Sequence, residues 1–224
     1  MIWQSFIDFF SFKDPNVVYV VAGIIFINSS SAMVGTFAYL RKRSLLADAV
    51  SHALLPGICM GFLFAGEKNM PALITGAFIT GWISIYLVDL IVRKSRIKQD
   101  AAIAMVISFF FAIGIVLLTY IQKHGNGNHA GLDHFLFGQA AAISKYDVLL
   151  FAIVFVVILF AVVLLYKNLV ILSFNPDFAQ SVGIPVRFIE FFLTSLTVLA
   201  IAIGIQALGV ILISALIITP AATA

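Results

Sequence analysis

The chain has 224 residues, of which 62% are hydrophobic and only 10% are charged, whereas about a quarter of the residues in a soluble domain are charged. This composition excludes an ordinary water-soluble domain. The net charge of +3 does not indicate nucleic-acid binding, because the basic residues lie beside long apolar segments and follow membrane topology. Cys59 is the single cysteine, so no intrachain disulfide forms.

Residues 1–14 precede the first long apolar segment. They contain Asp8 but neither a basic cluster nor a following small-residue cleavage site, so we predict no signal peptide. We expect a short amphipathic helix that lies on the membrane surface.

Long apolar segments make up most of the remaining chain. The charge-free stretches 101–121 and 148–166 reach the length of about 20 residues that a helix needs to cross a bilayer. We therefore predict an all-α fold, a polytopic transmembrane helical bundle of about seven membrane segments that forms a single domain over residues 1–224. The predicted spans are 17–40, 45–65, 70–92, 101–121, 148–166, 188–205 and 207–223.

The end of the chain is uncharged from Phe191 onwards, which is too long for one crossing. Gly204, Gln206 and Gly209 mark the expected break between the last two spans. The chain stops after a Thr-Pro-Ala-Ala-Thr-Ala sequence with no charged residue to anchor the helix end, which is consistent with a C-terminally truncated sequence.

The distribution of basic residues predicts the orientation, because positively charged loops stay in the cytoplasm. Nine Lys and Arg residues fall on one side of the predicted spans and four on the other. The N-terminus is therefore predicted outside. The segment 167–187 is then the longest cytoplasmic loop, and 122–147 is the longest outer loop; both are long enough to hold short helices.

Ionisable residues inside spans are costly, and two of them have a local explanation. Asp89 lies four residues before Arg93, and Glu190 lies three residues after Arg187. These spacings bring each pair onto one helix face. We predict structural ion pairs at the span ends.

Asp48 and His52 lack such a basic neighbour. Their spacing of four residues places both side chains on one helix face, about one turn apart. Carboxylate and imidazole together suit a divalent first-row metal such as zinc, manganese or iron. The structural alternative is an N-capping Asp and a core His that is hydrogen-bonded to a neighbouring helix.

Two further groups are candidate metal ligands. Cys59 lies seven residues beyond His52, two turns along the helix, although a buried Cys is more often a small hydrophobic residue. The outer loop contains His124, His129, Asp133 and His134 at irregular spacing among Gly and Asn, which is more typical of a solvated loop.

Motifs of energy conversion and hydrolysis are missing from the sequence. It contains no Gly-x-x-x-x-Gly-Lys-Ser/Thr loop, no Gly-x-Ser-x-Gly and no His-Glu-x-x-His. The absence of these motifs argues against a membrane-embedded hydrolase, and we predict that the chain is no enzyme. Energy for any transport would come from a partner or from an ion gradient.

The run from Arg41 to Gly57, RKRSLLADAVSHALLPG, strongly resembles the signature of the permease subunits of bacterial ABC importers for zinc, manganese and iron. A second similarity is the stretch Asn175–Val186, NPDFAQSVGIPV. Further matches are Leu136-Phe137-Gly138, Gly209-Val210 and the final Thr219–Ala224. Family members usually continue for one or two more membrane segments after this last motif.

The resemblance implies a permease subunit that moves a divalent transition metal into the cytoplasm by alternating access. Asp48 and His52 match the Asp and His that the family uses for the transported metal; Cys59 and the outer-loop histidines gain nothing from it. No permanently bound cofactor is expected. The implied partners are a cytoplasmic ATP-binding subunit, an extracytoplasmic metal-binding protein and a second permease copy or paralogue, in a bacterial inner or plasma membrane.

The second match implies a contact with the ATP-binding subunit. This coupling segment lies within the predicted cytoplasmic loop 167–187, where Gly183 is expected to supply a turn. An ion-gradient-driven secondary metal carrier remains the alternative, because it would use the same two ligands without an ATPase. The residues assigned to coupling are Asn175, Pro176, Asp177, Phe178, Ala179, Gly183, Ile184 and Pro185.

Overall fold

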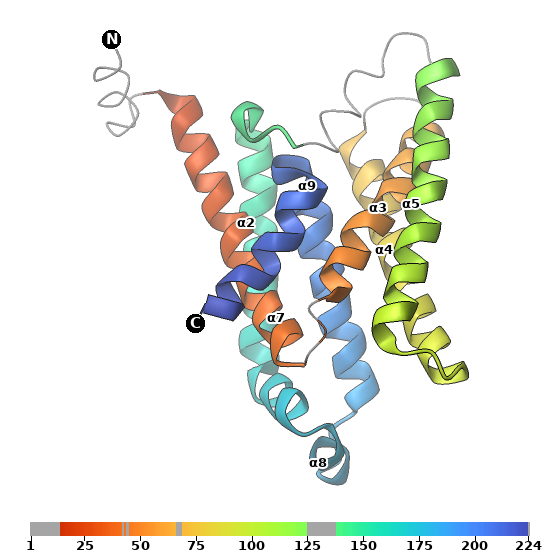
Figure 1. The fold of residues 1–224 in the computed structure, drawn as a ribbon. Coiled ribbons are helices and arrows are strands. Elements are labelled where there is room, and N and C mark those ends of the chain that lie inside the picture. The colour runs from red at the N-terminus through yellow and green to blue at the C-terminus, as the bar shows by residue number, and fades with distance from the viewer. Residues whose placement is uncertain (1–13, 42, 44, 66–68, 125–137, 224) are drawn as a thin grey trace.

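The computed structural model describes residues 14–41, 43, 45–65, 69–124 and 138–223. Within these ranges the chain is helical and holds no β-strand, which confirms the predicted all-α bundle (Figure 1). The surface helix predicted at residues 1–14 lies outside the described residues, except for Asp14. The elements are α2 (Pro15–Leu40), α3 (Leu45–Ala65), α4 (Met70–Lys94), α5 (Gln99–His124), the 3₁₀ turn η1 (Ala140–Ala142), α7 (Lys145–Phe174), α8 (Pro176–Ser181) and α9 (Val186–Thr223).

Six helical segments among the described residues are long and apolar enough to cross a membrane. They agree with the first six predicted spans. A shorter apolar helix, Leu212–Thr223, takes the place of the predicted seventh. The six are Pro15–Leu40, Leu45–Ala65, Pro71–Lys94, Gln99–Lys123, Lys145–Phe174 and Val186–Val210.

The break in α9 falls at Gly209, one of the three expected positions. Its φ of 78° and ψ of 169° are not helical, and only glycine adopts such angles readily. Beyond it the chain packs back against α2: a Cβ added to Gly35 would lie 1.9 Å from the carbonyl oxygen of Ile217. Gly204 and Gln206 remain within the helical part of α9.

Helix α3 is the most enclosed helix of the bundle, since it packs against α4, α5 and α9. Its contact with α4 is a backbone contact. A Cβ on Gly57 would lie 2.1 Å from Thr80 Oγ1 and 2.3 Å from the Gly76 carbonyl oxygen. Small residues allow such an approach, and close packing holds helices together in lipid.

Helix α7 lies at the edge of the bundle and packs mainly against α2. Its start is fixed by a capping box, in which the Asp147 backbone N–H donates to Ser144 Oγ and the Ser144 backbone N–H donates to the Asp147 carboxylate. Much of its surface consists of exposed apolar side chains, including Val156, Phe160 and Leu164. Such a surface suits contact with acyl chains.

The helices alternate in direction, so their connections gather at two ends (Figure 1). One end holds the C-termini of α2 and α4 together with α8, and the other holds the N-termini of α2, α4 and α7. The segment predicted as a loop from 167 to 187 is partly helical, because α7 continues to Phe174. Eight described basic residues belong to the α8 end: Arg41, Arg43, Arg93, Lys94, Arg96, Lys98, Lys167 and Arg187.

Candidate metal site and coupling segment

Asp48 and His52 meet on one face of α3, within the first two turns of this helix. The distance from His52 Nε2 to Asp48 Oδ1 is 3.6 Å, as the spacing of one helical turn predicts. The Asp48 side chain is 43% exposed and the His52 side chain 28% exposed. Both polar tips are therefore accessible on a helix whose other faces are buried.

An aromatic ring of α5 packs against the imidazole, and Ser51 beside it bonds to its own helix. The His52 ring packs edge-to-face on Phe111 of α5, with ring centroids 5.5 Å apart, an arrangement that aromatic rings favour. The adjacent Ser51 is fully buried, and its hydroxyl donates to the Ala47 carbonyl of its own helix. The described structure assigns Asp48 no Lys or Arg partner, so its carboxylate is available to a cation.

One chain supplies only part of a metal site at this position. No group of three or more His, Cys, Asp or Glu side chains placed to hold a metal occurs among the described residues. Cys59 is fully buried, with Sγ 3.9 Å from the Gly114 carbonyl oxygen of α5, and does not join Asp48 and His52 in such a group. Of the outer-loop candidates, residues 125–137 lie outside the described part of the chain.

The carboxylates of Asp89 and Glu190 form ion pairs, but with partners from another helix connection. Asp89 pairs with Arg43 at 3.7 Å, not with Arg93, and Glu190 pairs with Arg41, not with Arg187. The local pairs that we expected were therefore wrong in their partners. Both partners belong to the connection between α2 and α3, which our sequence reasoning had used only for topology and the family signature.

The predicted coupling segment folds as a short helix between two sharp turns. Asn175 ends α7 and caps α8, because its side-chain oxygen accepts from the Phe178 backbone N–H. Gly183 has a φ of +84°, which matches the turn expected there. Ala179 is buried, while Phe178 and Val182 are exposed. The segment thus presents apolar side chains at the end of the bundle.

At the opposite end of the bundle lie two contacts that the sequence did not predict. Gly138, from the Leu-Phe-Gly match, has a φ of +79° and lies against the backbone of Leu208 and Gly209, 2.4 Å from the Leu208 carbonyl carbon to an added Cβ. Nearby, Gln206 Nε2 donates to Asp147 Oδ1 at 2.8 Å. Two glycines with positive φ therefore meet at the break in α9.

Comparison with known proteins shows which transport proteins this chain is similar to. The chain is 44% identical over 212 residues to the manganese transport system membrane protein MntC of Bacillus subtilis, covering 95% of this chain and 49% of that protein. It is 42% identical over 213 residues to the zinc transport system membrane protein TroC of Treponema pallidum, covering 95% and 72%. The chain thus spans about half the length of the first relative and nearly three quarters of the second.

A solved structure shares the fold. PsaBC from Streptococcus pneumoniae, in complex with a Fab, superposes with a TM-score of 0.83 at 32% identity and covers 100% of this chain and 76% of that chain. The model of the ABC 3 transport family matches residues 13–224. The chain therefore belongs to the ABC 3 transport family.

Proposed function

We propose that this chain is the membrane-spanning permease subunit of an ATP-driven importer that moves zinc, manganese or iron into the bacterial cytoplasm by alternating access. The observation that carries the proposal is the accessible Asp48–His52 pair on the enclosed helix α3. Membership of the ABC 3 transport family supports it, as does the similarity to membrane proteins of manganese and zinc transport systems.

The ligand pair suits a cargo that must be released. A closed structural zinc site has four protein ligands, whereas this chain brings together one carboxylate and one imidazole. A second permease copy or a related chain would complete the coordination and form the other half of the pathway. Oxygen and nitrogen ligands suit zinc, manganese and iron alike, so the choice among these metals is left to experiment.

A direct route connects the coupling segment with the metal pair. Helix α8 leads through the turn at Gly183 into α9, and Glu190 in the second turn of α9 pairs with Arg41. Arg41 lies just before α3, seven residues from Asp48. Closure of an ATPase dimer against α8 would therefore shift the start of α3, in the manner of packed elements that switch between two arrangements.

The orientation follows from the charge distribution. The α8 end holds most of the basic residues and would face the cytoplasm, which places the N-terminus outside. An extracytoplasmic metal-binding protein would then deliver the ion at the end where Gly138 meets Gly209. Cysteine labelling checks this: Lys145→Cys should react with an impermeant reagent from outside and Gln180→Cys should not, while the buried Cys59 stays silent. The reverse labelling pattern would show that the N-terminus lies inside and that the predicted orientation is wrong.

Metal uptake tests the site itself. Asp48→Asn and His52→Leu should each abolish uptake. Replacing a residue that only supports a metal ligand lowers metal affinity or activity by roughly tenfold or more, and losing the ligand itself should cost at least as much. Asp100→Asn is the matched control, since Asp100 is an exposed acid in the first turn of α5, as Asp48 is in the first turn of α3. Wild-type uptake in both test variants at equal expression would show that the pair is structural.

Co-purification separates the proposal from its rival. An ABC permease should retain an ATP-binding subunit stoichiometrically, in the wild type and in both site variants, because Asp48 and His52 lie away from α8. A secondary carrier would use the same ligands but retain no ATPase. Uptake that persists without any ATP-binding subunit and follows an imposed ion gradient would establish that rival.

A further inference from the structure

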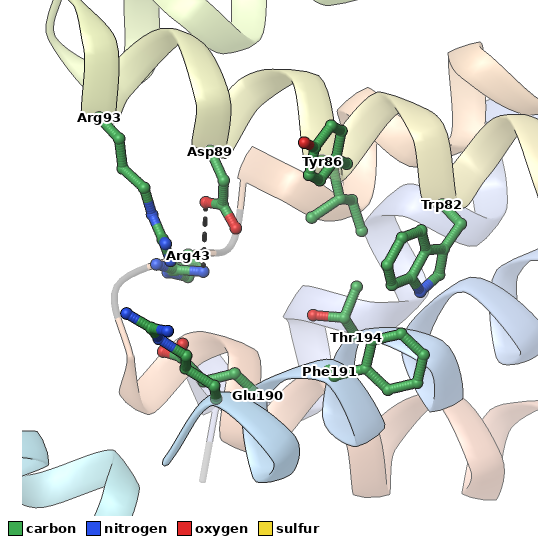
Figure 2. A pocket seen from close by; sticks show the side chains of 10 residues that line it. Arg43, Trp82, Tyr86, Asp89, Arg93, Glu190, Phe191 and Thr194 are labelled. Atoms are coloured by element: carbon green, nitrogen blue, oxygen red, sulfur yellow. Dashed lines mark ion pairs between the residues drawn. The ribbon is translucent and has the colours of Figure 1, made fainter. Parts of the chain in front are cut away.

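A pocket of about 290 Å³ opens between α4 and α9 at the α8 end of the bundle (Figure 2). It is separate from the Asp48–His52 pair, since neither residue lines it. Arg43 and Arg93 lie at one end of the pocket, here called its outer part, and Trp82 and Phe191 lie at the other end, its inner part (Figure 2). The basic and aromatic lining residues are Arg43, Arg93, Arg187, Trp82, Tyr86 and Phe191.

The charges of the pocket do not balance. Three arginines line it against two carboxylates, Asp89 and Glu190. Asp89 forms an ion pair with Arg43. Glu190 forms an ion pair with Arg41, which does not line the pocket. No ion pair involves Arg93 or Arg187 within the described part of the chain. Two guanidinium groups therefore remain for an anion.

The arrangement of the side chains adds to this charge. Arg93 extends from α4 towards Arg43 in Figure 2, so two like charges face the same space. Like charges at short range repel one another unless an anion lies between them. Planar guanidinium groups match phosphate oxygens in bidentate hydrogen bonds. The outer part of the pocket is therefore suited to a phosphate group.

The inner part of the pocket reaches into the membrane. Trp82 lies eleven residues before Arg93 on α4, which is about 16 Å along the helix and half of a hydrocarbon core of about 30 Å. Its ring packs edge-to-face on Phe191 of α9 at 4.8 Å, and its Nε1 donates to Ser195 Oγ at 3.3 Å. A soluble partner could cover the arginines but could not reach this depth.

An exposed apolar stripe continues from the pocket along α4. Ile79, Ile83 and Tyr86 are 56%, 43% and 56% exposed, and their spacing of four and then three residues places them on one helix face. A ligand with a phosphate at one end and a long apolar chain at the other would contact the arginines and this stripe together.

We propose that the α4–α9 pocket binds an anionic phospholipid, with its phosphate on Arg93 and Arg187 and an acyl chain along Ile79, Ile83 and Tyr86. Basic pockets between membrane helices recognise such headgroups. The assignment of the lipid to the cytoplasmic leaflet rests on the proposed orientation, but binding itself depends neither on the orientation nor on metal transport.

Native mass spectrometry of the full chain, purified with its associated subunits, tests the site. Phosphatidylglycerol and net-neutral phosphatidylcholine with identical acyl chains are offered to delipidated protein. The wild type should prefer phosphatidylglycerol, and Arg93→Gln with Arg187→Gln should reduce that preference by roughly fivefold for each arginine. Lys94→Gln with Arg96→Gln is the matched control, because both are exposed basic residues at the same helix end outside the pocket lining.

Equal loss of preference in the two double variants would overturn the proposal, as would no loss in either. Inorganic phosphate at the same concentration should not displace the lipid; if it does, the pocket is a phosphate site and not a lipid site. A phosphatidylglycerol carrying a photoreactive acyl chain tests the wild type directly. Labelling should map to residues 79–86, and labelling confined to other helices, or a bound ATPase that blocks the labelling, would refute the site.

Discussion

Helices α3 and α7 belong to the same bundle but lie in opposite environments, since α3 is mostly buried and α7 is mostly exposed. In its most apolar stretch α3 is 78% buried, whereas α7 is 22% buried. The buried helix carries Asp48, Ser51 and His52, and the exposed helix carries no charged residue between Asp147 and Lys167. The polar residues therefore lie on the more enclosed of the two helices, and the more exposed helix presents a surface of apolar side chains.

The different burial of the two helices follows from the lipid that surrounds the bundle. Between helices in a bilayer the apolar contacts are no better than contacts with lipid, so close packing and polar contacts decide which helix is enclosed. Helix α3 has glycines that reach the backbone of α4, while α7 has no glycine at all. A site for an ion can then be placed on α3, with its ligands on the one face that the neighbouring helices leave accessible.

The largest effect is expected from a charge on the lipid-facing side of α7. Val157 lies near the middle of this helix and is 48% exposed. Val157→Asp should make the free energy of membrane insertion less favourable by about 3 kcal/mol. The fraction of chains inserted into the membrane should therefore fall. The fraction is measured by membrane extraction, with Val157→Leu as the control. Full insertion of the Asp variant would show that this face contacts water or protein and not lipid.

A somewhat smaller effect is expected where α3 touches α4. Gly57→Ala places a methyl group 2.3 Å from the Gly76 carbonyl oxygen, and the backbone there can yield only by separating the helices. Overpacking of this kind costs about 2 kcal/mol, which thermal unfolding in detergent should register. Val156→Ile, which adds one carbon on the exposed face of α7, should leave the midpoint unchanged. An unchanged midpoint for Gly57→Ala would disprove the close contact.

A substitution at Gly183, in the turn between α8 and α9, should affect transport more than stability. A Cβ on Gly183 meets nothing within 4 Å, so Gly183→Val acts only through its φ of +84°, at a cost of about 1 kcal/mol or more for a branched side chain. Moving α8 should uncouple ATP hydrolysis from metal uptake while insertion stays intact. Gly183→Asn is the control, since Asn tolerates this backbone conformation. Full transport in the Val variant would refute the coupling assignment.

Local features of the sequence predicted local features of the structure. The length of apolar segments gave the spans, and a four-residue spacing placed Asp48 beside His52, because helix geometry fixes both. The positive φ at Gly183 and at Gly209 fell where glycine had suggested a turn and a break. Each of these predictions needed only residues within a few turns of one another.

Contacts between distant segments could not be predicted in this way. Glu190 has an Arg three residues before it, yet it pairs with Arg41, 149 residues away. Periodicity tells which face of a helix is buried but not which helix covers that face. The same limit explains why the meeting of Gly138 with the break in α9, and the hydrogen bond from Gln206 to Asp147, became visible only in the folded chain.

The smallest effect is expected at Ser51, and it separates polarity from function on α3. Ser51 lies between Asp48 and His52 in the sequence and is fully buried, with its hydroxyl donating to Ala47 at 2.8 Å. Ser51→Ala removes this bond without leaving a buried acceptor unpaired, because the Ala47 carbonyl still accepts the backbone N–H of the next turn. Alanine also favours the helix slightly more than serine.

The unfolding free energy of the Ser51→Ala variant should therefore stay within about 0.5 kcal/mol of wild type, and its metal uptake should equal that of wild type. Asp48→Asn, three residues earlier, changes a group of the same helix that is accessible and has no Lys or Arg partner among the described residues. This change should stop uptake at equal stability. If Ser51→Ala also stopped uptake, any polar group on α3 would matter for transport, and accessibility would no longer distinguish the metal pair from its buried neighbour.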